Sequence, residues 1–239
     1  NYKNRLIKLI SCFLLVSSSL SVMLLMSRAA IIALFLVFIS IILLSVFANK
    51  KKYYFANGLL ILSLSISIFS YNLINEKNAY NIIGERFSNV TNPTVDGSVN
   101  ERLNFYTTSV QSIIENPLLG IGFGNWKIKS IDLSKDIISS YRVPYFVHND
   151  FLQITAETGI IGGLCFIFFI MFPFWISFKR TIKHKLFNLD FMIFLIFLVY
   201  IIDSMLNFPF ERPINLIYLF FTIVLFYQSE KYYLKWEDY

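Results

Sequence analysis

The sequence carries little charge for its length. Of its 239 residues, 15% are charged, while 56% are hydrophobic and 18% aromatic. Soluble domains are about 25% charged, so this composition excludes an ordinary soluble domain and indicates a membrane protein. The net charge of +6 favours a membrane surface over nucleic acid, because the basic residues gather beside apolar runs. The clusters are Lys3, Arg5 and Lys8; Lys50, Lys51 and Lys52; and Lys179, Arg180, Lys183 and Lys185.

Cysteine and histidine are scarce, with two of each. Cys12 and Cys165 lie inside apolar runs and lack the spacing of metal ligands, so nothing indicates a disulfide framework. The sequence also lacks an Asp-x-Asp metal site, a Gly-Lys-Ser/Thr phosphate loop and a Gly-x-Ser-x-Gly elbow. These absences predict chemistry without a metal or cofactor, in which arginines handle negative charge.

Long apolar runs predict an all-α integral membrane protein with about six transmembrane helices, each needing about 20 apolar residues. The first run follows "NYKNRLIKLI" without a small-residue cleavage site, so we expect no signal peptide, and a start at Asn1 rather than Met indicates a piece of a longer chain. The predicted spans are roughly 8–26, 29–48, 54–74, 158–178, 189–206 and 213–228.

The basic clusters place both chain ends in the cytoplasm. We therefore expect three transmembrane helices in 1–74, a large and mostly helical periplasmic loop domain in 75–157, three more spans in 158–228 and a cytoplasmic tail in 229–239. The turn at Ser27-Arg28 and the turn "NFPFER" fall on the same outer face.

The outer loop contains one clear helical segment. "ERLNFYTTSVQSIIENPLLGIGFGNW" predicts a helix that ends at Asn116-Pro117 and opens into a glycine loop. Gly120, Gly122 and Gly124 either present backbone N–H groups to an anion or form a tight turn beneath Trp126, and we favour the turn. A second short helix is expected after Pro144, running into the fourth span.

Arginines are the candidates for anion binding. Arg28 interrupts an apolar run, where it is either a turn residue that reaches the lipid headgroups or an anion clamp. Arg102 opens the predicted loop helix, and Glu101 beside it offers a purely local ion pair. Arg86 and Arg142 need no special explanation as residues of a polar loop.

"VHNDFLQITAETGIIGG" places His148 on the outer side, just before the fourth span. With an ordinary pKa of about 6.5, this histidine is able to accept a proton from a hydroxyl at neutral pH. The alternative is a polar helix start, with Asn149 or Asp150 as the cap. Asp203, near the outer end of the fifth span, is a functional candidate or a structural partner of Arg212 or Arg28. The other histidine, His184, is expected to be interfacial.

Four segments together resemble the carboxy-terminal half of bacterial O-antigen ligases and polymerases. They are "MSRAAIIALFLVFISIILL", "ERLNFYTTSVQSIIENPLLGIGFGNW", "HNDFLQITAETGIIGGLCFIFF" and "DSMLNFPFERP", in that order. The resemblance spans nearly the whole chain, although the family usually carries several more amino-terminal helices.

The resemblance implies a helical, metal-independent glycosyltransferase of the bacterial inner membrane that takes a glycan from undecaprenyl diphosphate at the periplasmic face. Arg28 and Arg102 match arginines that would bind the diphosphate, and Arg86 is a looser third match. His148 matches the histidine proposed as base for the acceptor hydroxyl. The position of Asp150 varies in the family, so no catalytic role is assigned to it.

The acceptor stays open at this point. A ligase would use lipid A-core, a polymerase a second lipid-linked glycan and a protein O-oligosaccharyltransferase a Ser or Thr hydroxyl. Outside the family, a transporter or flippase of lipid-linked sugars would use the same arginines without a base, and a non-catalytic envelope partner would need neither. The absence of an internal repeat and the long outer loop argue against a transporter.

Overall fold

The structure is a computed structural model that describes residues 10, 13–22, 27–48, 58, 61–66, 68–69, 97–133, 145–184 and 188–237. The chain divides into two compact units, Asn1–Asn92 and Pro93–Tyr239. Within the described ranges all regular secondary structure is helical. The expected all-α membrane fold is therefore confirmed in class.

The first unit contains α2, Arg28–Ala48, and a shorter apolar helix, Phe13–Val22. After Arg28, α2 has no charged residue, and large side chains such as Phe35 and Phe47 are about two-thirds exposed, at 65% and 66%. A helix that is apolar on every side fits lipid as its solvent. Hydroxyls within it, such as those of Ser40 and Ser45, donate to carbonyls one turn earlier.

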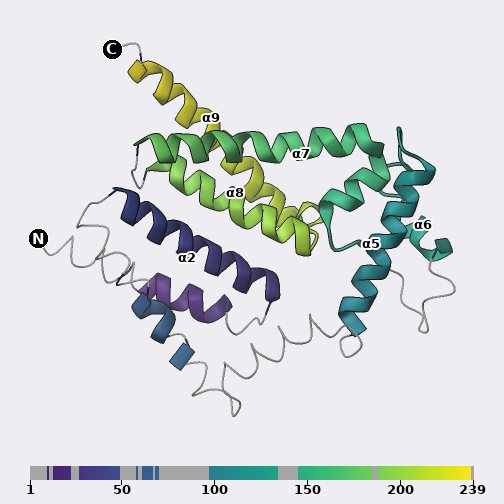
Figure 1. Cartoon of the computed structure of the whole chain (residues 1–239), viewed down its shortest axis with the longest axis horizontal. Helices are drawn as coiled ribbons and strands as arrows, with labels where there is room; N and C mark the ends of the chain where they lie inside the picture. Colours follow the sequence, from purple (N-terminus) through teal and green to yellow (C-terminus); the bar gives the residue numbers. More distant parts are fainter. Residues whose placement is uncertain are drawn as a thin grey trace, which may run out of the picture. The chain divides into compact units, whose positions relative to one another are not determined.

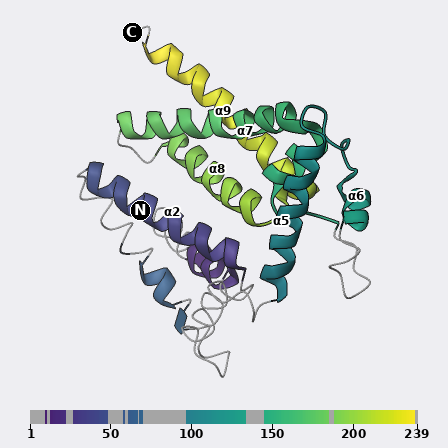
Figure 2. The same cartoon turned by 45° about the vertical axis from the view of Figure 1, so that its right-hand side comes forward.

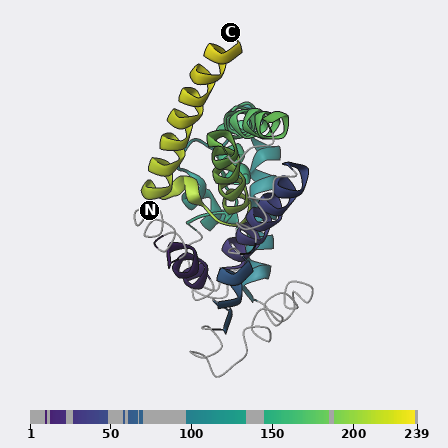
Figure 3. The same ribbon diagram turned by 90° about the vertical axis from the view of Figure 1, so that its left-hand side faces the viewer.

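The second unit contains the outer segment and the last helices of the chain (Figure 1). Its elements are α5 Gly97–Glu115, α6 Trp126–Leu133, α7 Asp150–His184, α8 Leu189–Leu206, the 3-10 turn η1 Pro209–Glu211 and α9 Pro213–Glu237. The helices α7 and α8 form a hairpin, and α5 lies across the end of the hairpin at which α7 begins, in both Figure 1 and Figure 2. Figure 3 shows α9 along one side of this hairpin.

Among the described residues, three helices are long and apolar enough to cross a bilayer: Ala29–Ala48, Asp150–His184 and Leu189–Leu206. They correspond to the predicted spans 29–48, 158–178 and 189–206. The predicted spans at 8–26 and 213–228 contain shorter apolar helices, Phe13–Val22 and Pro213–Ser229. Most of the prediction at 54–74 lies outside the described residues.

The helix α7 breaks at Gly159, whose φ of 76° and ψ of 178° are not helical. This conformation is essentially restricted to glycine, and a Cβ at this position would collide with the carbonyl of Leu118. The break separates a short first segment, Asp150–Thr158, from the apolar part of α7. This is the short helix expected after Pro144, and it starts at Asp150.

The core of the second unit is formed by apolar side chains of α7, α8 and α9. Lipid tails are as apolar as these side chains, so close packing stabilises the contact more than transfer out of water does. The buried members are Ile154, Phe166, Ile170, Ile193, Phe197, Tyr200, Ile201, Leu219 and Phe226.

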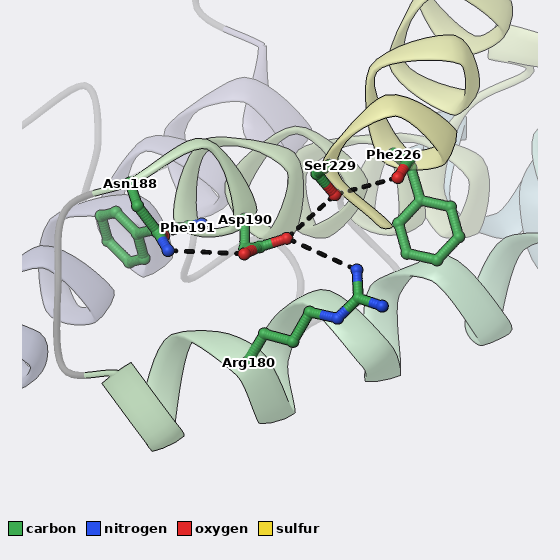
Figure 4. Close-up of polar contacts among 6 residues, drawn as sticks. All are labelled: Arg180, Asn188, Asp190, Phe191, Phe226 and Ser229. Atoms are coloured by element: carbon green, nitrogen blue, oxygen red, sulfur yellow. Dashed lines mark hydrogen bonds and ion pairs between the residues drawn. The ribbon is translucent and has the colours of Figure 1, made fainter. Parts of the chain in front are cut away.

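A polar cluster joins the same three helices at the end away from α5 (Figure 4). The carboxylate of Asp190 accepts a hydrogen bond from the Ser229 hydroxyl at 3.0 Å and lies 3.8 Å from a guanidinium nitrogen of Arg180. The guanidinium of Arg180 also stands 5.7 Å from the ring centre of Phe226. Buried at 5% exposure, the Asp190 charge needs such partners, and the cluster fixes α9 against the hairpin.

Candidate functional site

His148 stands two residues before α7 in a backbone conformation that is unusual for a residue with a side chain. Its φ is 62°, and a left-handed conformation of this kind costs about 1–3 kcal/mol unless its surroundings hold it. The hydroxyl of Tyr106, on α5, donates to the His148 carbonyl at 3.2 Å. The preceding N–H, that of buried Val147, donates to the side chain of Gln153 at 3.0 Å. Neighbours on α5 and α7 therefore hold the backbone on both sides of His148.

The helix start directly after His148 is capped as predicted. The side chain of Asn149 accepts from the backbone N–H of Leu152 at 3.1 Å, and its carbonyl accepts from that of Gln153 at 2.9 Å. This confirms the cap interpretation for Asn149. The cap does not use the imidazole of His148. A helix cap at Asn149 and a proton-accepting His148 are therefore compatible.

Aromatic rings enclose the imidazole of His148. The ring of Phe105 is parallel to it at 6.5 Å between centroids, and that of Phe208 meets it edge-on at 5.0 Å. Nδ1 is buried, with no hydrogen-bond partner in the described part of the chain. Burial lowers the pKa of His148 below 6.5, and the charges of Arg102 and Arg212 lower it further. The imidazole is therefore neutral, and able to accept a proton, at pH 7.

Arg102 connects α5 to the end of α8. Its guanidinium donates to the carbonyl of Leu206, the last residue of α8, at 3.1 Å. A cation at the carboxyl end of a helix is favoured by the helix dipole. The local ion pair with Glu101 is not what positions this guanidinium. Its contact with α8 brings it close enough to His148 to lower the pKa of the imidazole.

The turn "NFPFER" supplies the other side of the site. Phe208 stacks on Phe146 at 4.2 Å between centroids, and the guanidinium of Arg212 lies 4.6 Å from the Phe208 ring centre. The carboxylate of Asp203 accepts from the Asn207 side chain at 2.7 Å. The alternative that paired Asp203 with Arg212 is therefore wrong, because each group has a different partner.

Two hydrogen bonds fasten this turn to the start of α7. The backbone N–H of Phe210 donates to the buried carboxylate of Asp150 at 2.9 Å. The side-chain amide of Gln153 donates to Glu211 at 2.9 Å. Burial raises the pKa of Glu211, the charge of Glu157 raises it further, and that of Lys127 opposes both. Asp150 thus has a structural role in holding this turn.

The glycine loop after α5 packs into the break of α7. The N–H groups of Ile121 and Gly122 donate to the carbonyls of Ala156 and Glu157 at 3.0 and 2.9 Å. In return, the Ile160 N–H donates to the carbonyl of Pro117 at 2.8 Å. The break at Gly159 leaves these α7 groups free of helical bonds. The N–H of Gly120 donates to the carbonyl of Asn116 at 3.0 Å. Because Gly120 and Gly122 use their N–H groups within the protein, the turn interpretation is supported for these two glycines.

Glu157 fixes the next helix to the same place. Its carboxylate accepts from the backbone N–H of Trp126, the first residue of α6, at 3.1 Å. Both residues are buried, Glu157 at 2% and Trp126 at 1% exposure. The Glu-x-Gly pattern of the sequence therefore has a structural cause: the glutamate caps α6, and Gly159 admits the loop.

The predicted site residues are brought together only in part. His148 and Arg102 meet in the second unit, from segments 46 positions apart in the sequence. Arg28 begins α2 in the first unit, and its side chain is outside the described residues. Arg86 and Arg142 also lie outside the described residues.

Sequence reasoning missed three residues that shape the site. Tyr106 and Phe208 were passed over because aromatic residues are common in this chain, and Arg212 was considered only as a partner of Asp203. The "NFPFER" turn itself was a usable signal, since an arginine follows an aromatic residue there at the expected outer face.

A comparison with protein families identifies a relationship. The family model described as O-antigen ligase matches residues 13–167, which include Arg28, Arg102 and His148. No curated protein and no solved structure matches the chain. The match ends within α7, so the turn that carries Phe208 and Arg212 lies beyond it.

Proposed function

Because the chain belongs to the O-antigen ligase family, we propose that it transfers a glycan from undecaprenyl diphosphate to an acceptor hydroxyl. Membership and the apolar helices make it a multi-pass membrane protein of a glycan-transfer family. The donor, the direction of the site and the residue roles are our proposal. The observation that carries it is the imidazole of His148 directly before α7, contacted by the rings of Phe105 and Phe208, with the charges of Arg102 and Arg212 lowering its pKa.

His148 is the proposed general base. Its Nδ1 is buried, which leaves Nε2 to meet the acceptor hydroxyl. The hydroxyl proton moves to Nε2 while the hydroxyl oxygen bonds to the anomeric carbon of the donor sugar. The bond from that carbon to the diphosphate oxygen breaks, and its electron pair leaves with undecaprenyl diphosphate.

Arg102 is the proposed diphosphate ligand in this unit. A guanidinium has five N–H donors, and the contact with the Leu206 carbonyl involves only one of its nitrogens. The remaining donors suit phosphate oxygens, whose charge grows as the leaving group departs. Arg28 and Arg86 are proposed as further diphosphate ligands on the resemblance alone.

The proposed orientation follows from the basic clusters. Six spans would place both chain ends in the cytoplasm, and residues 75–157 would form the periplasmic domain between 1–74 and 158–228, with a cytoplasmic tail at 229–239. In this orientation the end of α7 that carries His148 faces the periplasm of the bacterial inner membrane. A lipid-anchored diphosphate would lie at the same depth.

The acceptor is not specified by these residues. Lipid A-core, a second lipid-linked glycan and a protein hydroxyl all require the same base and the same donor site. Analysis of glycans in cells that lack the gene separates them: single surface repeats indicate a polymerase, and long chains left on the carrier indicate a ligase. An unchanged glycan profile favours a protein acceptor or a non-enzymatic role.

The transporter alternative is tested by variants of His148. We expect His148→Ala protein, reconstituted in vesicles with lipid-linked glycan, to bind the donor and fail to transfer it. A flippase would move the donor across the bilayer without needing this imidazole. Full flipping without any transfer by the parent protein would contradict the proposed function.

A further inference from the structure

Arg212 presents a guanidinium beside His148 that has no carboxylate partner among the described residues. The acidic groups around it are engaged elsewhere. Asp203 accepts from the side chain of Asn207, and Glu211 accepts from that of Gln153. Arg212 is exposed. Because these carboxylates do not pair with it, its N–H donors remain available to another anion.

Phe208 holds this guanidinium in place. The guanidinium lies 4.6 Å from the ring centre of Phe208, and the same ring touches His148 edge-on at 5.0 Å between centroids. Phe146 stacks on Phe208 at 4.2 Å and restrains it further. A cation–π contact of this kind restrains the guanidinium without using its N–H donors.

The backbone around Arg212 is also fixed. Its N–H donates to the carbonyl of Pro209 at 3.1 Å, and its carbonyl accepts from Asn215 and Leu216 at the start of α9. Proline at position 213 begins that helix, which is a favoured place for it. Arg212 therefore stands on a rigid corner between η1 and α9.

Arg102 and Arg212 reach the imidazole from different elements. Arg102 comes from α5 and is anchored at the end of α8, whereas Arg212 comes from the corner before α9. Arg102 binds the carbonyl of Leu206, two residues before Phe208, and the ring of Phe208 contacts both Arg212 and His148. Two positive charges directed at one site favour an anion there.

We propose that Arg212 is a second phosphate-binding arginine, so that Arg102 and Arg212 together bind the two phosphate groups of a diphosphate next to His148. This inference rests on the proposed function for the identity of the donor. The ligand class itself, a diphosphate ester, follows from the two separate guanidinium groups and the absence of a carboxylate counterion for either in the described part of the chain.

The test uses inorganic diphosphate as the probe and transfer of lipid-linked glycan as the readout. Purified full-length parent, Arg212→Ala and Arg212→Lys proteins are compared, with Lys179→Ala as the control. Lys179 is an exposed cation at the far end of α7, over the ring of Trp175. Thermal unfolding of each variant is measured first, so that the comparison uses folded protein.

Arg212→Ala should weaken inhibition by diphosphate about 10- to 100-fold, the range expected for losing a charge-assisted hydrogen-bond pair. The KM for the donor should rise in parallel, and Arg212→Lys should lie between parent and Ala because it keeps the charge and loses the fork. Lys179→Ala should match the parent. A contact that is merely structural would lower the unfolding temperature without changing inhibition by diphosphate.

Equal inhibition of the parent and Arg212→Ala proteins would overturn the proposal. The experiment distinguishes failure of the Arg212 proposal from failure of the proposed glycan transfer. If the parent transfers no glycan but its diphosphate binding still depends on Arg212, the function fails and the binding site stands. If the parent transfers glycan and Arg212→Ala is unchanged, the function stands and this inference fails.

Discussion

At the scale of single residues, the site combines the imidazole of His148 with two arginines, Arg102 and Arg212, whose charges disfavour its protonation. The imidazole of His148 is half-buried among aromatic rings. Desolvation and positive neighbours both disfavour imidazolium. A histidine in this setting is ready to accept a proton at the pH where a free histidine is already partly protonated.

The pH dependence of transfer should reflect this lowered pKa. The charged and titratable groups around the ring are Arg102 and Tyr106 from α5 and Arg212 from the corner before α9. Since burial and both arginines lower the pKa of His148, the acidic fall of kcat/KM should lie below pH 6.5. Arg212→Ala removes one cause, so its acidic limb should move to higher pH. The limb of Lys179→Ala should not move, and an equal limb in Arg212→Ala would contradict this assignment.

Substitution of Arg102 is expected to lower the transfer rate more than the partial exposure of its side chain would indicate. Arg102→Lys keeps a charge but loses the planar fork, which in the proposed site contacts the Leu206 carbonyl and a phosphate together. We expect kcat to fall by about 100-fold, as when one positioned donor is removed from a charged transition state. Transfer by Arg102→Lys at the parent rate would remove Arg102 from the site.

His148 and Arg102 could be predicted as site residues from the sequence, but the residues that surround them could not. Each has a distinctive residue type in a recognisable segment. Phe208 and Arg212 reach His148 from about 60 positions away, across the α7–α8 hairpin. A contact between residues so far apart leaves no local sequence pattern, and sequence reasoning therefore considered Arg212 only as a partner of Asp203.

At the scale of elements, the break in α7 is the feature that organises the outer segment. Gly159 lies within an apolar stretch, and its role is set by a backbone conformation that hydropathy does not reveal. The end of α5 was predictable because Pro117 follows Asn116. The start of α5 at Gly97 was not, since "GSVN" is turn-like in composition and is helical only in this fold.

Gly159→Ala should loosen the docking of the glycine loop. The new Cβ would meet the carbonyl of Leu118 and would also occupy a backbone region reserved for glycine. Gly124→Ala is the matched control, because Gly124 has a φ of +76° but open space around a built Cβ. Thermal unfolding should show a much larger drop for Gly159→Ala, and equal drops would mean that the close approach to Leu118 is unimportant.

Substitution of Glu157 should affect stability, through the cap of α6, rather than the transfer reaction itself. Glu157→Gln keeps an oxygen that accepts from the Trp126 N–H, whereas Glu157→Ala leaves that buried N–H without a partner. We expect the alanine variant to lose about 1–3 kcal/mol of stability and the glutamine variant to lose less. Proteolysis near α6 and thermal unfolding measure both, and an equally stable alanine variant would contradict the cap.

At the scale of the whole molecule, composition was sufficient to predict a helical membrane protein, and the distribution of basic residues predicts its orientation. Three helices have the length and hydropathy of spans. The number and direction of the spans depend on shorter apolar helices such as Pro213–Ser229, whose length does not decide whether they cross the bilayer. The sequence could not predict how α5, α7 and the corner before α9 meet, because that depends on packing.

The predicted orientation is tested by labelling single cysteines in a variant without Cys12 and Cys165. Thr107 on α5 and Lys179 near the end of α7 are both exposed. Thr107→Cys should react with a membrane-impermeant maleimide in intact spheroplasts, and Lys179→Cys should react only after permeabilisation. The opposite pattern would reverse the orientation and place His148 on the cytoplasmic side.

The central claim is that His148 is the base of a glycan transfer, and single-turnover transfer by His148→Ala tests it most directly. Parent and variant proteins are saturated with lipid-linked glycan in vesicles, and product is followed after acceptor is added. The account predicts normal donor binding with the transfer rate reduced by about 100-fold or more, within the range for loss of a general base. Transfer at the parent rate by folded His148→Ala protein would contradict it.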